Sequence, residues 1–86
     1  MIILKPDVTR WAEVEGEIVA LELESSTYLG INRTGALLWP LLIQGSTSEA
    51  MTDVLVRTYE IPMAKAQTDV ADFIETLGAR GLLIDE

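Results

Sequence analysis

A chain of 86 residues with 14 acidic and 6 basic side chains, a net charge of −8, is large enough for one hydrophobic core, and we expect a single domain over residues 1–86. The acidic balance argues against a nucleic acid partner, because the phosphates would be repelled. Cysteine and histidine are absent, which excludes disulfides, the commonest general base and most zinc or iron–sulfur sites, so we expect no enzyme, no cofactor and no metal.

Hydrophobic residues make up 49% of the chain, which predicts a folded domain rather than a disordered segment. The longest apolar stretch, residues 36–43, is far shorter than the roughly 20 residues of a membrane-spanning helix and contains Pro40. Near Met1, charged residues and Pro6 interrupt the apolar region that a secretory signal needs. We therefore expect a cytoplasmic protein without a membrane partner.

The segment 8–23 alternates with a period of two, which is typical of half-buried strands. Glu15-Gly16-Glu17 divides it into two strands with a tight turn, since glycine adopts positive φ without steric cost. Ser25-Ser26 makes a second break, and the β-branched and aromatic residues of 27–31 predict a third strand. Three short strands joined by tight turns predict an antiparallel meander.

After residue 31 the apolar positions change to helical spacing. Asn32 is placed to cap a first turn, and we expect a helix over about residues 33–43. Pro40 removes a backbone hydrogen bond from this helix and should bend or strain it. Gln44-Gly45 then predicts its end.

Two further helices are expected downstream. Thr47 is placed to cap the first of them, and its apolar stripe consists of Met51, Val54, Leu55, Thr58 and Tyr59. The last helix begins near Pro62 or Met63, and its stripe consists of Val70, Phe73, Ile74 and Leu77. Gly78 and Gly81 predict its end, which leaves residues 82–84 as a short final strand or an extended tail. Three strands followed by three helices predict an α+β fold of the winged-helix type.

The run YLGINRTGALLW over residues 28–39 resembles the PqqD-like family, the peptide chaperones of pyrroloquinoline quinone biosynthesis. In that family an aromatic-rich strand passes through Asn and a Thr-small-Ala pair into a helix that carries Trp. The resemblance continues through residues 58–61 and 73–77 to Gly81-Leu82-Leu83, and it covers residues 8–84. The quinone chaperones often have Tyr-Tyr-x-Leu-Asn at the strand, from which Gly30 departs.

This resemblance implies a recognition element for ribosomally made, post-translationally modified peptides. Such a domain binds the leader of a precursor peptide by β-strand addition and presents the peptide to modifying enzymes. The sequence of residues 29–36 is most similar to that of the free-standing members of lasso peptide pathways. The partners of those members are a leader-cutting protease and an ATP-dependent cyclase.

The resemblance also implies a groove with residues 26–31 as one wall and residues 69–77 as the other. Leu29 and Ile31 are expected to face the helices, while Gly30 lets a partner backbone or a bulky leader residue approach. The expected peptide-binding residues are Ser26, Thr27, Tyr28, Leu29, Gly30, Ile31, Asp69, Val70, Asp72, Phe73, Thr76 and Leu77. The two aspartates are placed to pair with a basic or hydrogen-bond-donating leader residue.

Structural explanations compete with each of these assignments. The stripe of the last helix is also what a core requires, and Asp69, Asp72 and Glu75 also fit a solvated helix face. We expect Trp39 in the core, whereas Trp11 fits either the core or a second partner surface. Tyr28 fits either packing or peptide contact.

Two groups of paired carboxylates, Glu13/Glu15/Glu17 and Glu22/Glu24, lack the spacing of a calcium loop. We expect them to be solvated rather than to bind a cation. Alternative functions that remain open are a winged-helix nucleic-acid-binding protein and another protein-interaction adaptor. An enzyme that uses the carboxylates is a further alternative, although we expect no activity from the isolated domain.

Overall fold

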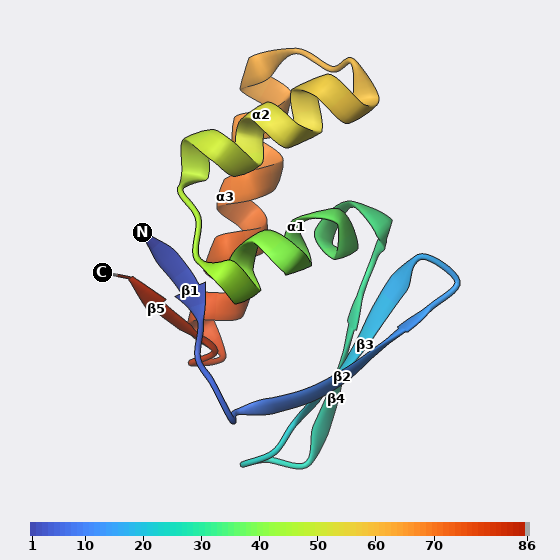
Figure 1. Cartoon of the computed structure of the whole chain (residues 1–86), viewed down its shortest axis with the longest axis vertical. Helices are drawn as coiled ribbons and strands as arrows, with labels where there is room; N and C mark the ends of the chain where they lie inside the picture. The colour runs from blue at the N-terminus through green and yellow to red at the C-terminus, as the bar shows by residue number, and fades with distance from the viewer. Residues whose placement is uncertain (86) are drawn as a thin grey trace.

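Two antiparallel sheets and three helices make up the protein, and the computed structural model describes residues 1–85 (Figure 1). In chain order the elements are β1 (Ile2–Leu4), β2 (Thr9–Val14), β3 (Glu17–Glu22), β4 (Thr27–Ile31), α1 (Arg33–Gln44), α2 (Ser48–Tyr59), α3 (Met63–Ala79) and β5 (Leu83–Asp85). The expected α+β class, with a three-stranded antiparallel sheet followed by three helices, is confirmed.

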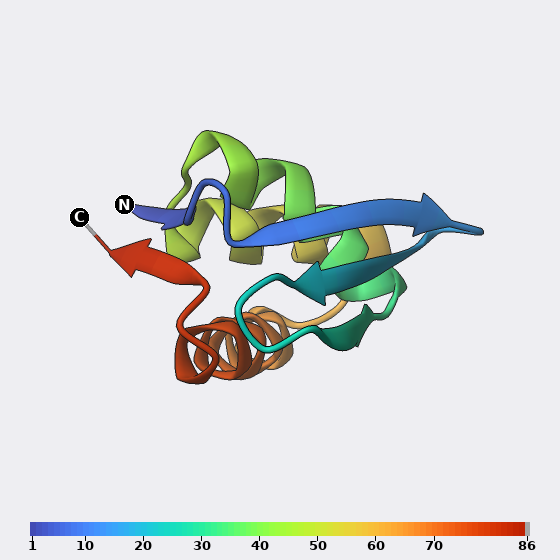
Figure 2. The same ribbon diagram turned by 90° about the horizontal axis from the view of Figure 1, so that it is seen from below.

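The three-stranded sheet has the order β2-β3-β4, so β2 and β4 are its edge strands (Figure 2). The predicted turn between β2 and β3 contains Glu15 and Gly16 with φ of 54° and 83°, the paired positive values of a type I′ hairpin turn. Ser26, with φ of 55°, lies in the turn before β4. The meander that the alternation predicted is therefore present.

Alternate residues of the sheet face the helices and form its inner face. Ile18 of β3 pairs with Ile31 of β4, and Ala20 pairs with both Trp11 and Leu29. Ile18, Ala20 and Ile31 are buried. Because directly paired residues project to the same side of a sheet, these pairs define the inner face on which α1 packs.

The two tryptophans meet between this inner face and α1. Trp39 of α1 is completely buried, as expected for a core residue. The Trp11 ring lies edge-on to it with ring centroids 6.0 Å apart and an interplanar angle of 74°. Trp11 thus belongs to the core contact, although 45% of it remains exposed because it lies on the edge strand β2.

Side-chain caps define where the first two helices begin. The Asn32 carboxamide oxygen accepts a hydrogen bond from the Gly35 backbone N–H at 3.0 Å, and Thr47 accepts one from Ala50 at 3.1 Å. Both caps were expected from the sequence. The first helix continues through Pro40 to Gln44, one residue beyond the predicted end.

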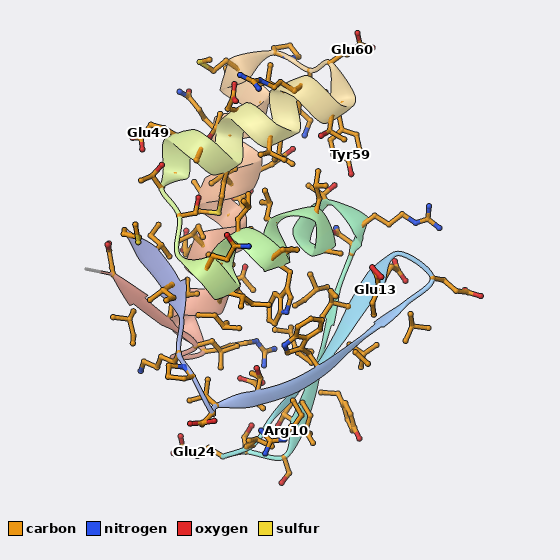
Figure 3. All side chains as sticks on the ribbon, in the orientation of Figure 1. Arg10, Glu13, Glu24, Glu49, Tyr59 and Glu60 are labelled. Carbon is orange, nitrogen blue, oxygen red and sulfur yellow. The ribbon has the colours of Figure 1, made fainter. Side chains whose placement is uncertain are left out.

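The expected stripes of α2 and α3 are buried only in part. In α2 the buried stripe ends at Leu55, and Thr58 and Tyr59 are exposed, with Tyr59 at the opposite end of the helix from Glu49 (Figure 3). In α3, Val70 and Leu77 are buried, whereas Phe73 and Ile74 are half-buried. Gly78 lies within α3 rather than after it. None of the helices in residues 1–85 combines the length and hydropathy needed to cross a membrane.

A second sheet, formed by β1 and β5, joins the two ends of the described chain. The expected strands began only at residue 8, so the prediction missed β1. It is antiparallel to β5, and Ile2 also exchanges backbone hydrogen bonds with Ser46 at 2.7 and 2.8 Å. For residues 82–84 the sequence allowed either a short strand or an extended tail, and in the structure most of this segment belongs to the strand β5. A three-residue strand is too short for its periodicity to be recognised.

One of the carboxylates expected to be solvated is buried. Glu22 is 8% exposed and accepts a hydrogen bond from the Arg80 guanidinium, which links β3 to the residue after α3. The other four carboxylates are exposed, as predicted. The expectation for Glu22 was wrong because its partner lies 58 residues away and no local pattern shows it.

Candidate peptide-binding groove

A groove of about 370 Å³ lies between β4, the start of α1 and the C-terminal half of α3. In Figure 2, β4 and α3 lie on the same side of the molecule. The residues that line the groove are Leu29, Gly30, Ile31, Asn32, Thr34, Gly35, Leu38, Asp69, Asp72, Phe73, Thr76 and Leu77.

One wall of the groove is the free edge of a sheet. β4 pairs with β3 on one side only, and within residues 1–85 no strand pairs with its other side. Every second residue of an edge strand directs its backbone N–H and C=O away from its neighbour. These groups form a template for one more antiparallel strand.

The floor of the groove is apolar. Ile31, Leu38 and Leu77 are buried, while Leu29 and Phe73 are half-buried and present apolar surface. Such a floor takes side chains by burial of apolar area. The expected orientation of Leu29 and Ile31 toward the helices is confirmed, since both belong to or pack against the core.

The close approach of the two walls depends on Gly35, in the first turn of α1. A Cβ atom at this position would lie 2.6 Å from Ile31 Cγ2 and 2.8 Å from Phe73 Cε1. Real Cβ contacts are not this short, so a side chain would push the Phe73 ring or Ile31 out of place. Gly35 therefore lets α1, β4 and α3 meet under the groove.

The charged side chains that line the groove, Asp69 and Asp72, are both acidic. Lys65 donates hydrogen bonds to both carboxylate oxygens of Asp69, at 3.1 and 3.2 Å, so this charge is already partly neutralised. Asp72 is exposed, and among residues 1–85 it makes no ion pair. The Thr76 hydroxyl donates to the Asp72 backbone carbonyl at 2.9 Å and leaves the carboxylate available.

Most of the expected site residues line this groove. They are Leu29, Gly30, Ile31, Asp69, Asp72, Phe73, Thr76 and Leu77. Four others lie outside it. Ser26 is in the turn before β4, and Thr27 lies at the far end of β4 from α1. Tyr28 projects from the opposite face of the sheet, and Val70 is buried in the core.

The expectation omitted the groove residues contributed by the start of α1, namely Asn32, Thr34, Gly35 and Leu38. The Asn-Arg-Thr-Gly-Ala run was recognised as a family feature, but its place under the groove depends on how α1 folds back against β4. The Asn32 cap was the available signal, because it marks where the chain turns from β4 into α1.

Within residues 1–85, no group of three or more carboxylates is placed to hold a metal ion. The exposed glutamates near the β2–β3 turn are spread over the two strands and the turn between them, and Figure 3 shows Glu13 on the side of the sheet that faces α1. The groove itself holds two aspartates together with neutral and apolar residues. This combination suits an extended peptide better than a small charged cofactor.

The fold and the groove define a class of protein: small α+β domains that offer a free sheet edge beside a helix. The chain belongs to the PqqD family, because the model of that family, described as coenzyme PQQ synthesis protein D, matches residues 17–83. This match covers more than three quarters of the chain and confirms the resemblance seen in the sequence. No curated protein matches the chain.

Two solved structures are similar over almost the full length. One is TbiB1 in complex with the TbiA(beta) leader peptide, with a TM-score of 0.86, 27% identity and coverage of 98% of this chain and 96% of that one. The other is a lasso peptide synthetase B1 complexed with the leader peptide, with a TM-score of 0.83, 25% identity and coverage of 98% of both chains.

Proposed function

We propose that this protein binds the leader segment of a ribosomally made precursor peptide as an added antiparallel strand on β4. The observation that carries the proposal is that the free edge of β4 is one wall of an apolar groove whose other wall is α3. The two similar structures support it, since each is a complex with a leader peptide.

Affinity and specificity have different sources in this arrangement. Backbone hydrogen bonds to β4 do not depend on the leader sequence, whereas alternate leader side chains enter the groove and are selected there. Burying one apolar side chain contributes about 1.5–3 kcal/mol. Two or three such anchors therefore supply several kcal/mol, from which the cost of ordering the peptide is subtracted.

The strand is added at β4 rather than at β2, the other edge of the sheet. The groove is lined by residues of β4, α1 and α3 and by none of β2. Charged residues, among them Arg10 and Glu13, occur along β2, and charges on an edge strand discourage pairing. The backbone template and the side-chain pocket thus coincide at β4 alone within the described sheet.

The rim of the groove favours a leader with a basic side chain near α3. The Asp72 carboxylate makes no ion pair within the described chain, while Asp69 already pairs with Lys65. An exposed pair of this kind contributes about 0–1 kcal/mol, so it selects among leaders and does not provide the main affinity. The same acidic rim gives no support to nucleic acid binding.

The protein has no catalytic role in this proposal. It holds the leader while the rest of the precursor is modified by other proteins, which for a lasso peptide are a leader-cutting protease and an ATP-dependent cyclase. These reactions take place in the cytoplasm.

Fluorescence polarisation tests the proposal. The probe is the labelled leader of the precursor encoded beside the gene for this protein, and the control is a scrambled peptide of the same composition. We expect low-micromolar or tighter binding of the leader and much weaker binding of the scrambled peptide. Equal binding of both peptides, or binding of neither, would overturn the proposal.

A further inference from the structure

The outer face of the three-stranded sheet, opposite α1, carries exposed apolar residues that the groove does not use. Val19 is 40% exposed and Tyr28 is 71% exposed. Val19 pairs with Gly30, and Leu21 pairs with Tyr28, so these four residues form two adjacent cross-strand rows that end at the free edge of β4. Arg10 belongs to the same face and points away from the helices (Figure 3).

Gly30 leaves a gap in this face at the edge of the sheet. A Cβ atom at Gly30 would meet no atom within 4 Å, and its φ lies outside the left-handed range that favours glycine. Neither packing nor backbone conformation therefore requires glycine at this position. The missing side chain exposes the β4 backbone between Val19 and the free edge, beside the Tyr28 ring.

We propose that this gap is a second subsite, which takes an aromatic side chain of the bound peptide; the inference rests on the proposed strand addition at β4. Side chains of an added strand alternate between the groove and the outer face. The peptide residue opposite Gly30 extends the row of Val19 and Gly30, and its side chain faces outward.

An aromatic ring fits the dimensions of this subsite. Val19 lies two strand spacings, about 10 Å, from the added strand, and no side chain stands between them. A flat ring laid across Gly30 covers the exposed backbone and extends toward Val19, which is how aromatic residues compensate for glycine at a sheet edge. Tyr28 is the diagonal neighbour, at about 7–8 Å, within reach of an aromatic partner.

The chemistry around the gap favours an apolar ring over a charged side chain. Two charged residues share the outer face: Arg10, which is separated from the added strand by two strands, and Glu17, which flanks Val19 on the side opposite Leu21 and lies one strand further from the added strand than Gly30 does. The direct neighbours of the gap are apolar or aromatic, since Val19 pairs with Gly30 and Tyr28 is the preceding residue of β4 on this face. The ligand class is therefore an extended peptide whose aromatic residue lies an odd number of positions from the residue that enters the groove.

Selection from a phage-displayed library of random 12-residue peptides tests this inference on the full chain. We expect the selected peptides to share an apolar residue for the groove and an aromatic residue at an odd distance from it. The variants Tyr28→Ser and Gly30→Val should both lose the aromatic preference, and Tyr28→Ser, whose residue lies outside the groove, should keep the apolar one. Val14→Ser, which removes an exposed apolar residue of the outer face on β2, is the matched control and should select the same peptides as the native chain.

Fluorescence polarisation with one selected peptide provides the quantitative arm. Replacing its aromatic residue with alanine should weaken binding to the native chain about three- to tenfold, the size expected of one aromatic pair, and to Tyr28→Ser less than twofold. Circular dichroism of each variant confirms the fold.

The outcomes separate the inference from the function on which it rests. Selection of no peptide overturns strand addition and the subsite together. Peptides that share only the apolar residue support strand addition and overturn the subsite. An aromatic preference that persists in both Tyr28→Ser and Gly30→Val also overturns the subsite.

Discussion

The Arg80 guanidinium donates a hydrogen bond to the Glu22 carboxylate and joins the end of α3 to the central strand of the sheet. The C-terminal end of α3 is thereby linked to β3, the neighbour of β4 in the sheet, by polar atoms rather than by apolar packing. The Glu22 side chain is almost buried, so the pair forms where solvent screens little on that side.

Removing the guanidinium should lower the stability of the protein. In Arg80→Ala the nearly buried Glu22 carboxylate loses its partner, and we expect the free energy of unfolding to fall by about 1–2 kcal/mol, measured by urea denaturation. Arg57→Ala is the control, because its ion pair with Asp53 at 3.0 Å is exposed on α2 and should contribute no more than about 0.5 kcal/mol. Equal effects of the two substitutions would contradict the prediction.

A carboxylate in the floor of the groove should abolish leader binding. Leu29→Glu and Phe73→Glu each place an uncompensated charge on apolar surface that a leader side chain would cover. Fluorescence polarisation should show no binding by either variant, while circular dichroism remains native. Ile43→Glu, at an exposed position near the end of α1, is the matched control and should bind normally. Full binding by both groove variants would mean that the leader lies elsewhere.

The charge of the rim should affect affinity without affecting the fold. Asp69→Lys and Asp72→Lys should each weaken leader binding about two- to fivefold and reduce its dependence on salt, because one exposed pair contributes about 0–1 kcal/mol. Glu75→Lys changes the same charge on the same helix at a residue that does not line the groove, and it should bind as the native chain does. If all three variants behave alike, the acidic face of α3 serves solubility only.

Alanine at Gly35 and at Gly78 should change stability in opposite directions, because only Gly35 is closely packed. Gly35→Ala should destabilise the fold by about 1–3 kcal/mol, because the added methyl group overpacks against Ile31 and Phe73. Gly78→Ala, within α3 where a Cβ meets no atom within 4 Å, should stabilise it by about 0.5–1 kcal/mol. Thermal unfolding measures both effects. A Gly35→Ala variant as stable as the native protein would show that Phe73 moves without cost.

Nucleic acid binding should be absent. At a net charge of −8, and with an acidic groove rim, the protein should leave labelled duplex DNA and single-stranded RNA unshifted in a gel at low salt. Low salt is the most permissive condition, since it strengthens any electrostatic attraction. A shift at micromolar protein would favour the winged-helix alternative.

Local patterns in the sequence predicted the elements well. The glycine of the β2–β3 turn, the Asn32 and Thr47 caps, and the change from period two to helical spacing each act between residues close in the chain. These interactions are physical causes of local structure, so they can be recognised without a structure. The family resemblance added the prediction that β4 and α3 form the two walls of one groove, which periodicity alone does not predict.

Several features that the sequence analysis missed depend on distant partners. The first strand, β1, needs β5 at the other end of the chain, and Glu22 needs Arg80. The groove lining by Thr34 and Leu38 needs α1 to fold back against β4. Val70 was assigned to the groove because it shares a stripe with Phe73, but a stripe is wider than the groove, and Val70 turns to the core.

The contact of Trp11 with Trp39 gives the protein a built-in optical reporter. Both tryptophans of the chain lie in this pair, and one is buried while the other is partly exposed to solvent. Their fluorescence emission and near-ultraviolet circular dichroism therefore report the packing of α1 against the sheet without any label. Trp11 lies on β2, the edge opposite β4. A spectral change on addition of a peptide would therefore reveal movement across the whole sheet, and an unchanged spectrum would show that the sheet receives the peptide as a rigid body.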